Sequence, residues 1–120
     1  MKYESSRFIK TGGMEWEPVN DKLKRKIMGL NDEIMMVLVH FQKGGIGERH
    51  AHFHSQTTYV ESGKFEVYID GEEQVLVAGD GFYIPPNIEH GAVCLEEGKL
   101  IDVFSPTRED FLEGVTGYSK

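Results

Sequence analysis

The sequence predicts an all-β protein, a sandwich or barrel of short strands, and two observations carry the prediction. Short segments rich in branched and aromatic side chains recur along the chain, separated by glycine-rich or Asp-Gly turns. Histidines also stand at alternate positions, a period that places side chains on one face of a strand. No repeat, low-complexity tract or linker divides the 120 residues, so we expect a single domain over residues 1–120.

The first half of the chain supplies the apolar strand and the histidine strand. Residues 34–41 form an apolar run typical of a buried strand. Residues 44–47 are glycine-rich and predict a flexible turn, which leads into a histidine strand that residues 57–61 continue. Residues 3–26 are less clearly patterned, with a loose alternation around Pro18.

The second half predicts a hairpin, a second turn and two further strands. Asp70-Gly71 is a hairpin signal between strands at 64–69 and 73–77. After the turn at 79–81, strands are expected at 82–84, 92–95 and 100–104, with Glu97-Gly98 separating the last two. Thr107 is expected to cap a short helix, with Asp110 three residues on.

Charge and composition exclude several classes of partner. The formal net charge of −7 argues against nucleic acid, whose binding depends on phosphate neutralisation, and against anionic membrane surfaces. No run approaches the ~18 apolar residues of a membrane span, and no apolar stretch follows the basic residues near the N-terminus. The single cysteine, Cys94, cannot form an internal disulfide. We therefore expect a cytoplasmic protein, in which any anionic substrate is attracted by a local feature.

Three histidines point to a metal site. His50, His52 and His54 alternate, Gln56 follows two residues later, and His90 stands behind the turn-forming Pro85-Pro86-Asn87. A strand would turn two or three imidazoles and an amide oxygen to one side, and a ligand from the remote hairpin could complete a mononuclear site. Imidazole suits zinc, copper, iron and nickel. The alternative is a polar surface strand that is rich in histidine.

The spacing resembles the two sequence motifs of the cupin family. The first is Gly44-x5-His50-x-His52-x3-Gln56-x6-Gly63, with Gln56 in place of the usual glutamate. The second is Gly79-x5-Pro85-x-Asn87-x2-His90-x3-Cys94, with Asn87 in place of glycine and Cys94 in place of asparagine.

This resemblance implies a cupin double-stranded β-helix, a jelly-roll barrel with a core at about residues 30–113 and a short C-terminal helical segment. It also implies one divalent transition metal ion (Ni, Zn, Fe or Mn), held by His50, His52, Gln56 and His90. Small cupins commonly pair subunits through N-terminal strands, so residues 1–29 imply a homodimer. The alternative is a strand folded back on its own barrel.

Several histidines and the cysteine have alternative roles. His54 is a residue of the pocket wall or, in a shifted register, a ligand, whereas His40 ends the apolar strand and is expected to be structural. Cys94 is expected to be a small buried hydrophobe. The neutral amide of Gln56 leaves the metal charge uncompensated, which favours an anionic ligand and disfavours the trivalent states used in oxygen chemistry.

Residues 82–92 and 101–112 are similar to the KdgF-type pectin-degradation cupins, and the similarity covers about residues 30–113. The family converts ring-form 4,5-unsaturated monouronates into open-chain keto acids, which implies a small anionic sugar acid as substrate. Asp102 would act as acid or base, Arg108 would clamp the carboxylate and Phe104 would stack on the ring. The alternatives are a solvated carboxylate for Asp102, a salt bridge with Glu109 or Asp110 for Arg108, and core packing for Phe104. Two other functions remain open, a sugar-binding or sensor cupin without catalysis and a metal-dependent dioxygenase.

Overall fold

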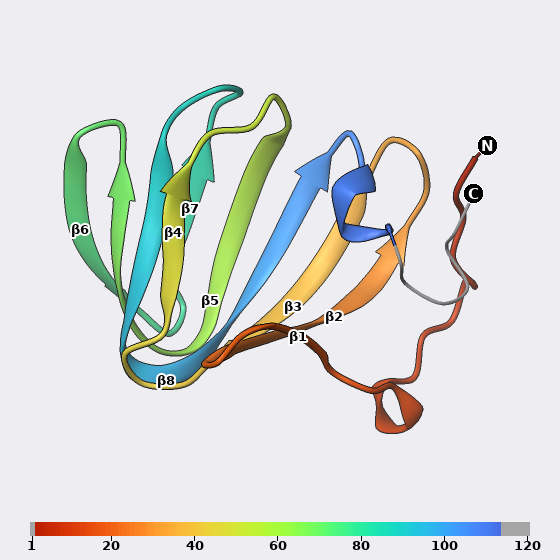
Figure 1. Ribbon diagram of the computed structural model, residues 1–120, viewed down its shortest axis with the longest axis horizontal. Coiled ribbons are helices and arrows are strands. Elements are labelled where there is room, and N and C mark those ends of the chain that lie inside the picture. The colour runs from red at the N-terminus through yellow and green to blue at the C-terminus, as the bar shows by residue number, and fades with distance from the viewer. Residues whose placement is uncertain (1, 114–120) are drawn as a thin grey trace.

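The computed structural model describes residues 2–113, and strands make up most of it (Figure 1). The strands are β1 (Glu17–Asn20), β2 (Leu23–Leu30), β3 (Met35–Phe41), β4 (Ile46–His50), β5 (Ser55–Ile69), β6 (Glu72–Val77), β7 (Gly81–Ile84) and β8 (His90–Ser105). Two 3-10 turns, η1 (Thr11–Gly13) and η2 (Glu109–Phe111), lie near the ends. The all-β prediction is confirmed.

Two long strands organise the molecule into two layers. The antiparallel sheet has the order β1-β2-β3-β8-β5-β6, with β4 added to β8 and β7 to β5. The last part of β8 pairs with β3 and with the first part of β5, which also pairs with β7. The first part of β8 pairs with β4 and with the last part of β5, which also pairs with β6. Figure 1 shows both long strands bending between the two groups, so the sheet folds over on itself.

Two glycines allow the bend. Gly63 has φ +86°, and a Cβ there would lie 2.6 Å from the Glu96 carbonyl oxygen. A Cβ on Gly98 would overlap the backbone of Ser62. The prediction that Glu97-Gly98 separates two strands was therefore wrong. Here glycine serves close approach of two chains inside a continuous strand rather than a turn.

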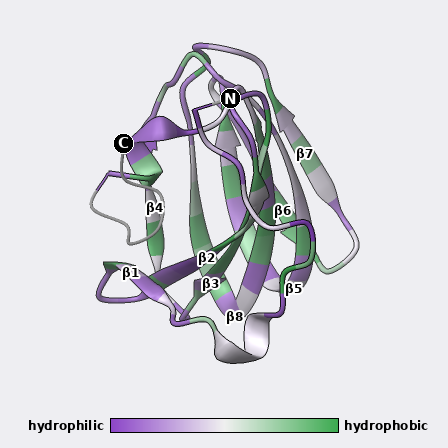
Figure 2. Ribbon diagram, turned by 90° about the vertical axis from the view of Figure 1, so that its right-hand side faces the viewer, coloured by the Kyte–Doolittle hydropathy of each residue, from purple (hydrophilic) through white to green (hydrophobic). Residues whose placement is uncertain are grey.

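The inner faces of the layers carry the core. In β3 the buried residues alternate with more exposed ones, and Met35, Val37, Val39 and Phe41 point inward. They pack with Val60, Phe65 and Leu100 of the two long strands. Figure 2 shows the same alternation of apolar and polar segments along the strands.

The predicted histidine strand is not continuous. β4 ends at His50, β5 begins at Ser55, and His52 and His54 lie in the irregular connection between them. The connection is held by the Asn87 amide, which donates to the His52 carbonyl at 2.7 Å. The glycine-rich segment at 44–47 was also not wholly a turn, because β4 begins at Ile46. By contrast, the Asp70-Gly71 hairpin is confirmed, with φ of +50° and +86° at its two residues.

The ends of the chain differ from expectation. The C-terminal helical segment is only the three-residue turn η2, and Thr107 does not cap it. The Thr107 hydroxyl instead donates to the backbone carbonyls of Asn31 and Ile34, the latter at 3.0 Å. At the other end, β1 pairs with β2 of its own chain, the alternative to intersubunit pairing. Among residues 2–113 no helix is long and apolar enough to span a bilayer.

Candidate metal centre and cavity

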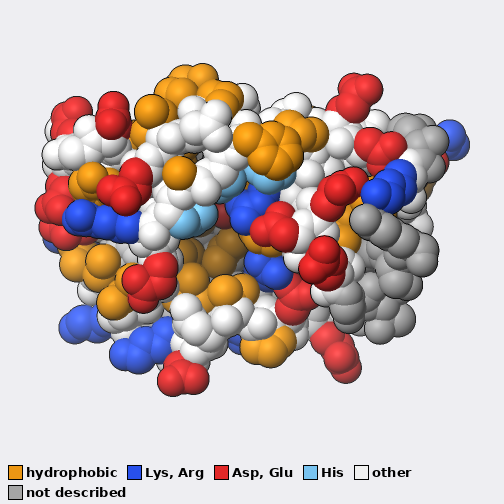
Figure 3. All heavy atoms as spheres, turned by 45° about the horizontal axis from the view of Figure 1, so that its top comes forward, with side chains coloured by type: hydrophobic (Ala, Val, Ile, Leu, Met, Phe, Trp, Pro, Cys, Tyr) orange, Lys and Arg blue, Asp and Glu red, His pale blue; other side chains and the backbone are white. Residues whose placement is uncertain are grey.

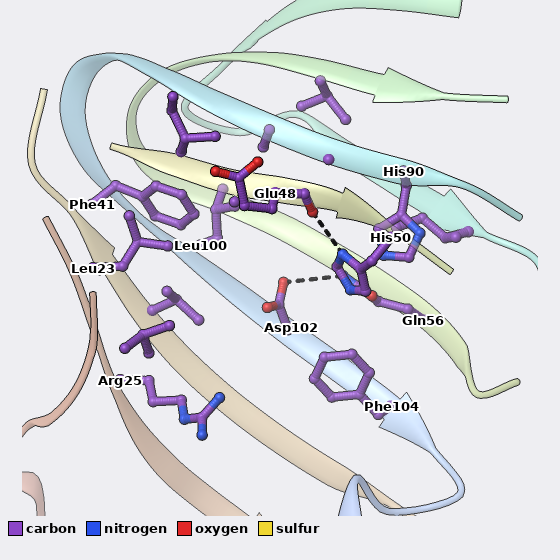
Figure 4. Close-up of a pocket in the computed structure, with 18 of the residues that line it drawn as sticks. Leu23, Arg25, Phe41, Glu48, His50, Gln56, His90, Leu100, Asp102 and Phe104 are labelled. Atoms are coloured by element: carbon purple, nitrogen blue, oxygen red, sulfur yellow. Dashed lines mark hydrogen bonds between the residues drawn. The ribbon is translucent and has the colours of Figure 1, made fainter. Parts of the chain in front are cut away.

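Three histidines converge at one end of the folded sheet. His50 ends β4 and lies opposite His90, the first residue of β8, in the strand register. His52 projects from the connection after β4, and one ring nitrogen from each of the three lies within 4.8 Å of the others. Figure 4 shows His50 and His90 facing the same cavity as Gln56 and Asp102. The convergence agrees with the predicted set although the histidines do not share one strand.

Hydrogen bonds orient all three rings in the same way. Each Nδ1 contacts a backbone carbonyl oxygen: that of Glu48 for His50 at 2.7 Å, that of His54 for His52 at 3.1 Å and that of Ile88 for His90 at 2.8 Å. A carbonyl only accepts, so Nδ1 carries the proton and donates. The Nε2 lone pairs are then left for a metal, which is the outer-shell arrangement that fixes histidine ligands.

The rings of His52 and His90 are held neutral. Burial lowers the pKa of His90 to about 4. Burial, reinforced by the positive charge of Arg108, also lowers the pKa of His52. Metal ligation requires neutral imidazole, so protons compete weakly for this site near neutral pH.

Gln56 directs its oxygen at the histidines. Its Nε2 donates to the Thr58 hydroxyl at 3.0 Å and approaches Asp102 Oδ1 at 3.5 Å, and its Oε1 lies 3.0 Å from His52 Nε2. With the proton on Nδ1, that last contact joins two electron-pair acceptors, which repel unless a cation lies between them. Two ligands each about 2.1 Å from a metal and at right angles lie about 3 Å apart. The residues present therefore fit a divalent transition ion.

His54 lies outside this group. Its ring is buried and stacks on Phe53 with centroids 4.0 Å apart, and its Nδ1 has no hydrogen-bond partner among the described residues. The ligand group found in the described residues contains His50, His52 and His90 without it.

A cavity of about 340 Å³ extends from the histidines between the two layers. Apolar side chains, including Phe41, Val67 and Leu100, line its inner part. Besides the histidines, its polar and charged lining residues are Asn20, Arg25, Glu48, Gln56, Asp102 and Arg108. Figure 3 shows histidine and basic side chains around the opening and apolar atoms within the hollow. Such a site is suited to a small ligand with a few oriented polar contacts.

Asp102 is an ionisable group in an apolar setting. Burial raises the pKa of its carboxyl from 3.8 to about 6, although the Thr58 hydroxyl hydrogen bond and the Arg108 charge favour ionisation. The Thr58 hydroxyl donates to Asp102 Oδ1 at 2.7 Å. Asp102 can therefore hold or release a proton near neutral pH.

Arg108 and Phe104 form the wall beside η2. Arg108 is buried, and its Nε and Nη2 donate to the two carboxylate oxygens of Asp110 at 3.0 and 2.8 Å. This is one of the two salt bridges that the sequence analysis gave as the alternative role of Arg108. Its guanidinium also lies 4.2 Å from the centroid of Phe111. Phe104 is buried, and its ring meets that of His52 edge to face with centroids 5.8 Å apart. Phe104 therefore belongs to the packed core and also lines the cavity.

Sequence reasoning missed three residues of the site. Thr58 joins Gln56 to Asp102, and it lies two residues after Gln56 on the same face of β5. Arg25 and Phe111 also line the cavity. Arg25 had a signal in the sequence, because a cation stands between Leu23 and Ile27 at strand spacing.

Cys94 is buried, and burial raises the pKa of its thiol, as expected of an inert cysteine.

Comparisons with known proteins agree with the fold. The family model for the cupin domain matches residues 37–104. The pectin degradation protein KdgF of Dickeya dadantii is 52% identical over 99 residues, covering 81% of this chain and 90% of that protein. An RmlC-like cupin from Shewanella frigidimarina superposes with a TM-score of 0.89 at 49% identity, covering 92% of this chain and 99% of that one. KdgF from Halomonas sp. superposes with a TM-score of 0.86 at 39% identity, covering 90% and 100%. The chain therefore belongs to the cupin family and, within it, to the KdgF-type cupins.

Proposed function

We propose that this protein is a metal-dependent enzyme that converts 4,5-unsaturated monouronates into linear keto acids in pectin or alginate breakdown. The similarity to a protein named for pectin degradation supports the substrate class. The observation that carries the proposal is the position of Asp102, a carboxyl with a pKa of about 6 in the cavity that the histidines and Gln56 border.

The reaction is an isomerisation that needs proton movement and no oxidant. Opening the ring removes a proton from the anomeric hydroxyl, forms the aldehyde and breaks the bond from the anomeric carbon to the ring oxygen. The ring oxygen, now the hydroxyl of an enol, loses its proton as C4 gains one, which produces the ketone. A group that exchanges protons near pH 6 serves both steps, and Asp102 is the candidate.

The neighbouring residues support this assignment of Asp102. The Thr58 hydroxyl fixes one carboxylate oxygen, so the second oxygen is the one to face the substrate. Apolar side chains such as Phe104 and Leu100 limit water around the carboxyl, which keeps its pKa high. Phe104 would also provide a surface for the sugar ring.

The chain offers a ligand set for the metal and an anion-binding group. His50, His52, His90 and Gln56 would hold the ion, which when bound would polarise the sugar oxygens as a Lewis acid. Arg108 has one terminal nitrogen, Nη1, that donates no hydrogen bond to residues 2–113. That nitrogen would serve the substrate carboxylate while the other side of the fork remains on Asp110.

Anaerobic incubation distinguishes the proposal from the two alternatives. Protein loaded with a divalent metal is incubated with unsaturated monouronate without oxygen, and the products are analysed by NMR. The expected product is the open-chain keto acid, formed at the same rate without oxygen as in air. A dioxygenase would require oxygen, and a sensor or sugar-binding cupin would bind the sugar without releasing product.

We also propose a cytoplasmic homodimer, with one domain whose core spans about residues 30–113. The single buried Cys94 is compatible with a reducing compartment. Met36, Tyr59 and Tyr83 are exposed on the outer face of the layer that contains β3, β5 and β7, which is compatible with a subunit contact. Sedimentation equilibrium would measure the number of chains.

A further inference from the structure

Arg25 occupies an inward-facing position that the strand pattern would give to an apolar residue. It lies between Leu23 and Ile27 on the buried face of β2. Across the layer its partner is Val39, whose own partner is the buried Leu100. A cation in such a row breaks the local pattern, and breaks of this kind concentrate at functional sites.

Two contacts fix the Arg25 side chain at the cavity wall. Its Nε donates to the Glu17 carboxylate on β1, and its guanidinium carbon lies 3.8 Å from the centroid of Phe111. Its side chain is only 18% exposed. Arg25 also lines the cavity that contains Asp102, and Figure 4 shows its guanidinium projecting into that space. The head group is thus held in one place before any ligand arrives.

The outer edge of this guanidinium is left for another acceptor. Within residues 2–113 neither terminal nitrogen of Arg25 donates a hydrogen bond, since only Nε reaches Glu17. Neither nitrogen is a buried donor without a partner, so both are open to the cavity or to solvent. Guanidinium edges of this kind bind carboxylates with two parallel hydrogen bonds.

Arg25 and Arg108 share one aromatic ring. Their guanidinium carbons lie 3.8 and 4.2 Å from the centroid of Phe111. The two carbons are therefore separated by no more than about 8 Å, and both side chains line the same cavity. Each is partly neutralised by one carboxylate, Glu17 or Asp110, and each keeps donors unused.

We propose that Arg25 is a specificity-determining residue that binds the carboxylate of the sugar acid together with Arg108. This rests on the proposed function for the substrate class, and it adds Arg25 of β2 to the residues already assigned to the substrate, Asp102, Phe104 and Arg108. Arg25 selects acids over neutral sugars and takes no part in proton transfer.

The test measures binding with saturated probes that cannot react. Calorimetry of the full chain, loaded with a divalent metal, compares galacturonate with galactose. Arg25→Gln should weaken galacturonate binding about 10-fold or more and leave galactose binding unchanged. Arg25→Lys keeps a cation and should lose less galacturonate affinity than Arg25→Gln. The lysine variant provides the test if the glutamine variant does not fold. Turnover of unsaturated monouronate is measured separately, so a failure of the proposed function and a failure of the Arg25 assignment are distinguishable.

Two control variants separate recognition from structure. Arg49 also pairs with a glutamate, Glu73, and lies 3.7 Å from the centroid of Tyr68, but it is outside the cavity. Arg49→Gln should therefore leave both affinities unchanged. Glu17→Gln removes a negative charge beside Arg25 while its amide oxygen can still accept from Nε, so it should not weaken galacturonate binding.

Three results would overturn the proposal. The first is a wild-type protein with no preference for galacturonate over galactose. The second is an equal loss of affinity for galacturonate and galactose in the Arg25 variants. The third is a loss in Glu17→Gln that matches Arg25→Gln, since that would assign Arg25 to holding β1 in place.

Discussion

Replacing Asp102 by asparagine should stabilise the metal-free protein at neutral pH. The same replacement should lower the turnover of the metal-loaded protein. Burial raises the pKa of the carboxyl from 3.8 to about 6, so folding disfavours its ionised form. Such a group contributes stability that is fully present below pH 3.8 and is lost as the pH rises through 6. The shift corresponds to about 3 kcal/mol at pH 7.5, at about 1.4 kcal/mol per pKa unit.

Asparagine never ionises and therefore avoids this loss. Its amide oxygen can still accept from Thr58, although the new amide hydrogens need partners, so the expected gain is about 1–3 kcal/mol at pH 7.5 and near zero at pH 4. Urea unfolding of both metal-free proteins at the two pH values measures the difference. In metal-loaded protein the same variant should retain its metal and lose turnover by about 10²-fold or more.

Asp32 provides a control of opposite sign. The backbone amides of Lys2 and Tyr3 donate to its carboxylate at 2.7 Å and lower its pKa. Asp32→Asn should therefore be less stable than the wild type at pH 7.5, with a smaller difference at pH 4. An Asp102→Asn variant with the same stability difference at both pH values, or with wild-type turnover, would refute the assigned role of Asp102.

Three other variants and conditions test neighbouring groups. Gln56→Glu should hold the metal more strongly against a chelator, because a carboxylate compensates its charge, and should reduce the preference for acidic sugars. Protonation of His90 should cost the metal-free protein about 3 kcal/mol as the pH falls from 6.5 to 4, because the pKa of His90 is about 4, so in urea unfolding the stability of wild type relative to His90→Asn should fall by about that amount over this range. Arg108→Gln should weaken galacturonate binding about 10-fold or more in calorimetry, whereas Asp110→Asn, which frees the guanidinium, should not weaken it.

The fold class could be predicted because turn chemistry and strand patterns are local. Asp70-Gly71 specifies a hairpin through backbone conformations that few other residue pairs adopt. Gly98 was wrongly predicted to lie in a turn, because glycine also allows two backbones to approach closely within a strand. Only the pairing of β5 with β8 shows that close approach is its role here. Thr107 misled for a related reason, since its hydroxyl bonds to distant carbonyls instead of its own turn.

The sequence predicted which residues would lie close together better than it predicted the backbone that positions them. Motif spacing selected His50, His52, Gln56 and His90, and the structure brings them together, although the strand assumed for them ends at His50. Spacing could not reveal that carbonyls from three backbone segments orient the rings. Nor could it reveal Arg25, whose place in the cavity depends on how β2 faces the turn η2.

The most direct test is the identity of the metal ligands in the purified protein. Elemental analysis should give one divalent transition ion per chain, and X-ray absorption should show imidazole and oxygen donors at about 2.0–2.2 Å with no sulfur. His90→Ala should abolish this binding, and His54→Gln should leave it intact. Loss of the ion in His54→Gln, or a sulfur ligand from Cys94, would contradict the ligand set and the cavity chemistry built on it.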